Sequence, residues 1–151
     1  MGETMNVDAM YQDIILDHYK NPHGKGLREP YEAEVYHVNP VCGDEITLRV
    51  HLDGETVADV SYDAEGCSIS QAAASVMNEL TVGENLDDSL VVLEDFNSLM
   101  HGQEHAGEER LKDGVAFAGV AQFPSRVKCA LLPWMAFKDA VAQASAGGDE
   151  T

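Results

Sequence analysis

Three cysteines and one aspartate of this sequence have side chains that suit metal or thiol chemistry. Cys42 and Asp44 flank Gly43, and a glycine permits a backbone turn that could aim both neighbouring side chains at one point. Thiolates and carboxylates are both zinc ligands. We therefore expect that this tripeptide can supply part of a metal site.

The other two cysteines lie where helices are predicted to begin. Cys67 directly precedes Ser68, a predicted helix cap, so unpaired backbone amides and the positive end of the helix dipole favour its thiolate. Cys129 falls in an early turn of the last predicted helix, beside the cations Arg126 and Lys128. A turn and two helix starts can meet at one end of a small domain, which would give three sulfurs and one oxygen.

A simpler interpretation fits the same residues. Isolated cysteines are among the most buried residue types, and the intervals between these three match no zinc-finger spacing. From the residues alone, metal ligands, inert core thiols and unrelated surface thiols all stay open. His101 and His105 have a helical spacing that could serve a metal, but Gly102 favours a solvated loop. The remaining histidines show no ligand spacing: His18, His23, His37 and His51.

The strand that positions Cys42 and Asp44 is predicted to follow them directly. Apolar and polar residues alternate from Ile46 to Leu52, as in a half-buried strand, and the Asp53-Gly54 dipeptide after it favours a tight hairpin turn. Val57 to Tyr62 is then the return strand. The segment from Glu34 to Val38 can pair as a third antiparallel strand, which gives a short sheet.

Helices are predicted before and after this sheet. An amphipathic helix from Met10 to Tyr19 ends at Asn21-Pro22, because the residue before a proline disfavours helical geometry. Beyond Gly66 the apolar residues recur at the helical period. Ser68 and Gln71 fit a capping box at the start of that helix, and Gly83 lies where it should end.

Two further helices are expected towards the C-terminus. One covers about Asp88 to Met100 and is followed by a polar segment, His101 to Gly114, which we interpret as a mobile surface loop. The last and longest starts near Pro124 and carries its apolar face to Val141. Pro133 lies within it and cannot donate to the carbonyl of Cys129, so we expect a kink there.

Composition narrows the functional classes. The chain of 151 residues fits a single domain, with an ordered core from about residue 8 to 144 and flexible tails. Its 27 acidic and 9 basic residues give a net charge of −18, which would repel nucleic acid and anionic lipid. Without a membrane span or a secretory leader, a cytoplasmic protein with reduced thiols is expected, so a disulfide framework is disfavoured.

Four stretches distributed along the chain carry a resemblance to a known family. Together they are similar to the SufU branch of the IscU-like iron–sulfur cluster assembly proteins, the group that includes the N-terminal domain of NifU. The stretches are YQDIILDHYKNP from Tyr11, NPVCGD from Asn39, GCSISQAA from Gly66 and RVKCALLPW from Arg126.

The resemblance implies an IscU-like (SufE/NifU) α+β fold with a small three-stranded antiparallel sheet, helices on one face and a long C-terminal helix. It also implies that one zinc ion is bound by Cys42, Asp44, Cys67 and Cys129. IscU-type scaffolds usually carry a histidine immediately before the third cysteine, whereas this chain has Lys128. That difference, and the longer segment between the second and third cysteines, are typical of the SufU branch.

What the resemblance implies about function is sulfur transfer. A protein of this branch accepts persulfide sulfur from a SufS-type cysteine desulfurase, which uses pyridoxal phosphate, and passes it to the downstream assembly complex. A histidine of the desulfurase would replace Cys42 at the zinc and free its thiolate to act. The fixed charge of Arg126 could orient the anionic persulfide, or Arg126 could be a surface cation at the start of the last helix. Two alternatives stay open: a scaffold that holds an iron–sulfur cluster at the same four side chains, and a structural zinc module that binds partners.

Overall fold

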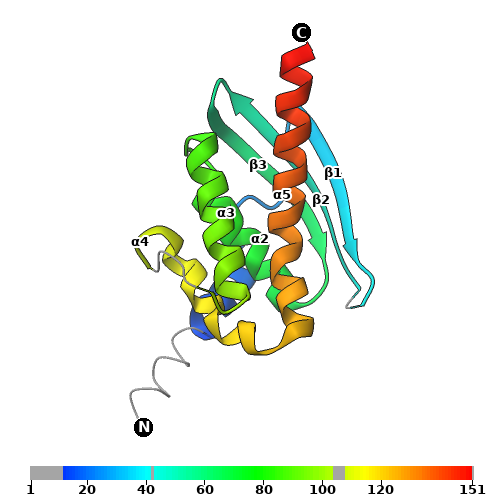
Figure 1. Ribbon diagram of the computed structural model, residues 1–151. Coiled ribbons are helices and arrows are strands. Elements are labelled where there is room, and N and C mark those ends of the chain that lie inside the picture. Colours follow the sequence, from blue (N-terminus) through cyan, green and yellow to red (C-terminus); the bar gives the residue numbers. More distant parts are fainter. Residues whose placement is uncertain (1–11, 42, 104–107, 151) are drawn as a thin grey trace.

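The structure of the protein is a computed structural model that describes residues 12–41, 43–103 and 108–150. Three antiparallel strands in the order β1-β2-β3 form one layer, and helices cover one face of this sheet (Figure 1). The strands are β1 (Ala33–Asn39), β2 (Asp44–Asp53) and β3 (Thr56–Glu65). The α+β fold class with a small antiparallel sheet is therefore confirmed.

The register of the sheet decides which side chains face the helices. In β1 and β2, Ala33 lies opposite Val50 and Asn39 opposite Asp44. The hairpin between β2 and β3 turns at Gly54 and Glu55, one residue later than the predicted Asp53-Gly54 turn, because Asp53 still pairs with Thr56. Successive side chains of a strand point to opposite faces. Because Ile46, Leu48 and Val50 are buried, Asp44 has the parity of the buried face.

Helices precede and follow the sheet in the sequence. Residues 12–20 are helical and precede the sheet, whereas α2 (Ser68–Thr81), α3 (Leu86–Met100) and α5 (Pro124–Glu150) follow it. The long helix α5 lies across β1 and β2 and also packs against α2, which contacts β3 (Figure 1). The chain leaves α2 at Gly83, whose φ of 89° suits glycine, as the sequence predicts.

Two expectations about helix boundaries need correction. The segment from His101 to Gly114 is not all loop: a turn follows α3, and α4 (Glu108–Leu111) leads into η1, a 3₁₀ helix (Lys112–Gln122). Leu111 is fully buried, and the Phe117 ring packs edge-on against Phe96 with centroids 5.5 Å apart, so apolar contacts order this segment. Residues 104–107 lie outside the described chain.

The last helix also extends further than predicted. α5 continues through Pro133 to Glu150, past Val141, the last residue of its predicted apolar face. Adding a residue to an existing helix fixes one residue for one backbone hydrogen bond, so an apolar stripe is not needed there.

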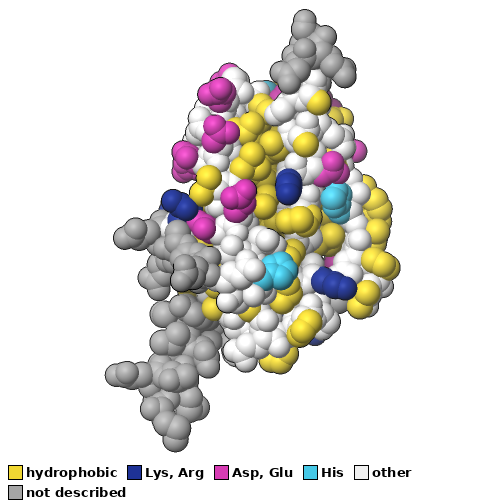
Figure 2. Space-filling view, viewed as in Figure 1, with side chains coloured by type: hydrophobic (Ala, Val, Ile, Leu, Met, Phe, Trp, Pro, Cys, Tyr) yellow, Lys and Arg dark blue, Asp and Glu magenta, His cyan; other side chains and the backbone are white. Residues whose placement is uncertain are grey.

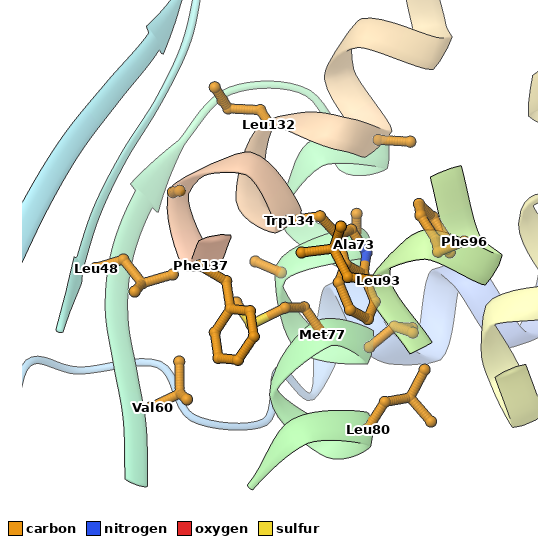
Figure 3. Close-up of a cluster of buried hydrophobic side chains, with 14 of the residues drawn as sticks. Leu48, Val60, Ala73, Met77, Leu80, Leu93, Phe96, Leu132, Trp134 and Phe137 are labelled. Carbon is orange, nitrogen blue, oxygen red and sulfur yellow. The ribbon is translucent and has the colours of Figure 1, made fainter. Parts of the chain in front are cut away.

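An aromatic cluster fills the space between α2, α3 and α5 (Figure 3). Trp134 stacks on Phe96 with ring centroids 5.1 Å apart and an interplanar angle of 23°. Phe137 lies beside Met77 and faces the sheet, and all four of these side chains are completely buried. The helix that carries Cys129 is therefore fixed to the rest of the domain one turn beyond the cysteine.

Truncation of Trp134 is expected to destabilise the whole domain. Replacement by Ala removes a buried aromatic side chain and leaves a cavity, which costs roughly 3–5 kcal/mol of the free energy of unfolding. Denaturant unfolding followed by circular dichroism measures this loss. The control is Phe123→Ala, because that side chain is 58% exposed and its removal should change stability by less than about 0.5 kcal/mol. Equal losses in the two variants would contradict the packing described.

An ion pair joins α5 to the first strand. His37 Nε2–H donates to Asp139 Oδ2 at 2.8 Å, and Gln143 donates to the other carboxylate oxygen at 3.1 Å. The hydrogen bond from His37 is the main reason why the pKa of Asp139 is lowered from its usual 3.8. The folded protein therefore binds fewer protons at this site than the unfolded chain.

The lowered pKa of Asp139 determines how its contribution to the stability of the fold changes with pH. A carboxyl group with a lowered pKa stabilises the fold above its ordinary pKa, and the contribution is lost as the pH falls through the folded-state value. We expect Asp139→Asn to be less stable than the parent protein at pH 6 by less than about 1 kcal/mol, because the pair is largely exposed. The difference should shrink as the pH falls below 3.8 towards the lowered folded-state pKa, as measured by urea unfolding. A constant difference across this range would contradict the assignment.

Acidic side chains gather on one end of the face that Figure 2 shows. They lie over the β2–β3 hairpin and the start of α3, next to an apolar strip between α3 and α5. This distribution agrees with a net charge of −18. In the described residues, no helix is long and apolar enough to cross a bilayer.

Candidate metal centre

Asp44 begins β2 and turns its carboxylate inward. It is completely buried, and its Oδ1 accepts a hydrogen bond of 2.9 Å from the backbone N–H of Cys67. Gly66 makes this approach of the two segments feasible, because a Cβ added there would lie 2.2 Å from Asp44 Oδ1. The end of β3 and the start of α2 are therefore held against the start of β2.

Cys67 is the N-cap of α2 and not the residue before the cap. The helix starts at Ser68, and no side chain caps it. The predicted capping box of Ser68 and Gln71 is therefore wrong: Asp44 takes the amide of Cys67, and the Gln71 side chain donates to the carbonyl of Gly66. The thiol still lies at the positive end of the helix, as the sequence predicts.

Cys129 reaches the same place from α5. It is completely buried, and its Sγ lies 3.5 Å from the carbonyl oxygen of Ser125. Because α5 packs against both α2 and β2, the thiol is directed towards the first residues of these two elements.

The three side chains converge on one point. Their donor atoms, one carboxylate oxygen and two sulfurs, all lie within 4.8 Å of one another. Cys67 Sγ and Asp44 Oδ2 are 3.9 Å apart. Ligand atoms of a tetrahedral zinc with bonds of about 2.0–2.3 Å lie roughly 3.3–3.8 Å apart, so a small contraction would fit them around one ion.

The charge of the cluster also favours a cation. Within the described part of the chain, no Lys, Arg or His side chain forms an ion pair with Asp44. Buried carboxylates are generally paired with a cation or a metal, and thiolates bind zinc as anions. The donor set of two thiols and one carboxylate therefore fits a zinc ion.

Cys42 lies outside the described residues, but the turn that contains it is held on both sides. Asn39 accepts the Gly43 N–H with its carbonyl at 2.9 Å and the Val41 N–H with its side-chain oxygen at 3.3 Å. Gly43 has a φ of 71°, the conformation for which a glycine was expected. The next residue, Asp44, already points into the cluster.

Asn39 was not identified from the sequence as a site residue. It is buried, and among the described residues its Nδ2 has no hydrogen-bond partner. The Asn-Pro dipeptide at the end of a strand is the signal that could have found it, because asparagine side chains often bond to backbone amides in turns. Asn39 therefore holds the turn through two backbone amides, those of Val41 and Gly43.

The two cations near Cys129 are both exposed. Arg126 lies in the first turn of α5 and lines a groove of about 620 Å³ together with Ser68 and Ile69 of α2. The guanidinium is therefore at the same end of the molecule as Cys67. Lys128 faces solvent, as expected from the sequence.

The fold and the cluster define a class of small α+β domains that gather thiols and a carboxylate at the end of a three-stranded sheet. The family described as NifU-like N-terminal domain matches residues 10–130. The chain belongs to this family.

Relatives in the family carry two kinds of name. The chain is 40% identical over 148 residues to the zinc-dependent sulfurtransferase SufU of Bacillus subtilis, an alignment that covers 97% of this chain and 99% of that protein. It is 36% identical over 135 residues to the iron–sulfur cluster assembly scaffold protein IscU of Streptococcus pyogenes, covering 89% of this chain and 84% of that one.

Solved structures agree with the fold. A protein from Fervidobacterium islandicum, described as a candidate iron–sulfur cluster assembly scaffold of the SUF system, superposes with a TM-score of 0.79 at 35% identity. The match covers 84% of this chain and 93% of that chain. An N-terminal NifU-like protein from Brucella abortus gives a TM-score of 0.83 at 22% identity, covering 93% and 97%, and supports the fold alone.

Proposed function

We propose that this protein is a zinc-dependent sulfur carrier of iron–sulfur cluster biogenesis. One observation carries the proposal: Asp44, Cys67 and Cys129 come from three separate elements and bring their donor atoms within 4.8 Å of one another. The similarity to a zinc-dependent sulfurtransferase over 97% of the chain supports it. Asp44, Cys67 and Cys129 would hold the ion, and Cys42, two residues before Asp44, would be the fourth ligand.

The chemistry proposed for Cys42 is nucleophilic. Zinc, when bound, keeps the coordinated thiols deprotonated. As a free thiolate, Cys42 would attack the outer sulfur of a persulfide on a cysteine desulfurase. A new sulfur–sulfur bond forms on Cys42, and the bond to the desulfurase cysteine breaks with that cysteine departing as a thiolate. The number of sulfur–sulfur bonds is unchanged, so no external oxidant or reductant is needed.

The surrounding residues suit a ligand that can be exchanged. Asp44 and Cys129 are completely buried, whereas Val41 beside Cys42 is 72% exposed. The turn that carries Cys42 is therefore at the surface, and a partner can approach it while the buried ligands retain the ion. Arg126, exposed at the same end, would orient the anionic persulfide.

A cluster scaffold is the second candidate, because a relative that is 36% identical is named as one. Protein purified without oxygen separates the two functions through its metal content and visible spectrum. We expect about one zinc per chain, no visible absorption, and stimulation of a SufS-type desulfurase when the protein is added to it. Iron with acid-labile sulfide would instead establish the scaffold, and zinc without any stimulation would leave only a structural zinc module.

A further inference from the structure

A second group of metal-binding side chains lies away from the thiols. His18 comes from the helical residues 12–20, His23 from the segment that follows them, and Glu79 from α2. One donor atom from each, two imidazole nitrogens and a carboxylate oxygen, lie within 4.8 Å of one another. Glu79 is more than fifty residues from the two histidines in sequence, so only the packing of the helical residues 12–20 against α2 brings it to them.

The distances within this group match metal coordination. Glu79 Oε2 lies 3.6 Å from His18 Nε2 and 3.4 Å from His23 Nε2. Both separations are too long for good hydrogen bonds. Two ligand atoms of a tetrahedral ion with bonds of about 2.0–2.2 Å lie roughly 3.3–3.6 Å apart, so the carboxylate oxygen is spaced from each imidazole as two ligands of one ion are.

His18 is oriented as metal-binding histidines are. It is 2% exposed, and its Nδ1 lies 2.7 Å from Ser75 Oγ, which also accepts the backbone N–H of His23 at 2.9 Å. With an ion bound at Nε2, Nδ1 would carry the proton and donate it to Ser75 Oγ. Metal-binding histidines usually have their second nitrogen fixed in this way.

A second carboxylate lies within hydrogen-bond distance of Nε2, and an ion bound to Nε2 would replace this contact. Asp113, from η1, places its Oδ2 2.9 Å from His18 Nε2. Two carboxylates therefore converge on one buried imidazole nitrogen, and no Lys or Arg of the described residues forms an ion pair with either of them. The side chains of Glu79 and Asp113 are 35% and 45% exposed, so an ion can enter from solvent.

We propose that His18, His23 and Glu79 form a second metal site for a divalent cation of the zinc and ferrous iron class. Two imidazoles and carboxylate oxygens suit these borderline cations, whereas magnesium and calcium prefer oxygen ligands alone. The site joins the helical residues 12–20 and the segment after them to α2. The site shares no residue with the thiol site, so this proposal does not depend on the proposed sulfur transfer.

Zinc stoichiometry of the full chain tests the site. Protein dialysed against micromolar Zn²⁺ is expected to retain two zinc ions per chain. Elemental mass spectrometry measures this content. His23→Gln and Glu79→Gln should each retain one, because both remove a ligand whose side chain is partly exposed and should leave the fold intact by circular dichroism. Ser75→Ala keeps all ligands but frees the His18 ring, so its second zinc should bind about 10–100-fold more weakly.

The matched control is His51→Gln. His51 also pairs with a carboxylate, Glu32, at 3.0 Å, but the group identified around His18 does not include it. This variant should keep both ions. A Co²⁺ titration supplies a second readout, because the thiol site gives sulfur-to-metal charge-transfer absorption and the histidine site does not.

Three outcomes would overturn the proposal. Retention of only one zinc by the parent protein would mean that the group around His18 binds no ion. A second zinc that persists in both His23→Gln and Glu79→Gln would lie elsewhere, as would one lost equally in His51→Gln. The ion at the thiol site should be unchanged in every variant.

Discussion

Cys42→Ala is expected to abolish the transfer of sulfur from a cysteine desulfurase while the protein stays folded. The variant lacks the proposed nucleophile, so stimulation of the desulfurase should fall by at least roughly 100-fold. The fold should survive because backbone groups of Asn39 and Gly43 and the side chain of Asn39 hold this turn, and none of these bonds involves the Cys42 side chain. Sulfide production from cysteine, measured with and without the variant, gives the effect.

The control must alter the same turn without touching the thiol. Val41→Ala does so, because Val41 is 72% exposed and contributes little to the core. Its stimulation should stay close to that of the parent protein. After reaction with desulfurase and cysteine, mass spectrometry should locate the added sulfur on Cys42. A persulfide on Cys67 or Cys129 would refute the proposed division of roles.

Gly66→Ala is expected to have the largest effect on zinc binding of any substitution outside the ligands. The added Cβ would lie 2.2 Å from Asp44 Oδ1 and 2.9 Å from its Cα, so the backbone itself would have to move. The φ of 144° adds strain for any residue with a side chain. Displacement of the Asp44 carboxylate should weaken zinc binding by roughly 100-fold, measured by competition with a chelator.

Gly26→Ala is the control that separates the steric clash with Asp44 from the backbone strain of a positive φ. Gly26 also has a positive φ, 106°, but an added Cβ there would meet nothing within 4 Å. Both variants should lose about 1–3 kcal/mol of stability through backbone strain, and only Gly66→Ala should lose zinc affinity. Similar zinc affinities in the two variants would show that Asp44 does not depend on the close approach of Gly66.

The local elements of this protein could be predicted because their signals are local. Alternation from Ile46 to Leu52, the hairpin turn near Gly54 and the helix stop at Gly83 each depend on a few neighbouring residues. The helical state of Lys112–Gln122 could not be predicted in this way. Its order comes from contacts such as that of Phe117 with Phe96, which the polar segment before it does not reveal.

The candidate thiol site was likewise predicted from the sequence only in part. The residue types at Cys67, Cys129 and Asp44 indicated metal chemistry, and the resemblance to a family placed them in one site. The capping of α2 was mispredicted because the amide of Cys67 is bonded by Asp44, which is remote in sequence and close only in the folded chain.

The sequence by itself determined the strands, the main helices and the reactive side chains, because periodicity and turn chemistry act over a few residues. Only the tertiary structure decided which distant groups meet. The approach of Asp44 to Cys67 past Gly66 depends on strand register, and the meeting of His18, His23 and Glu79 depends on helix packing. The histidines lack ligand spacing in the sequence, because their common neighbour comes from α2, more than fifty residues later in the chain.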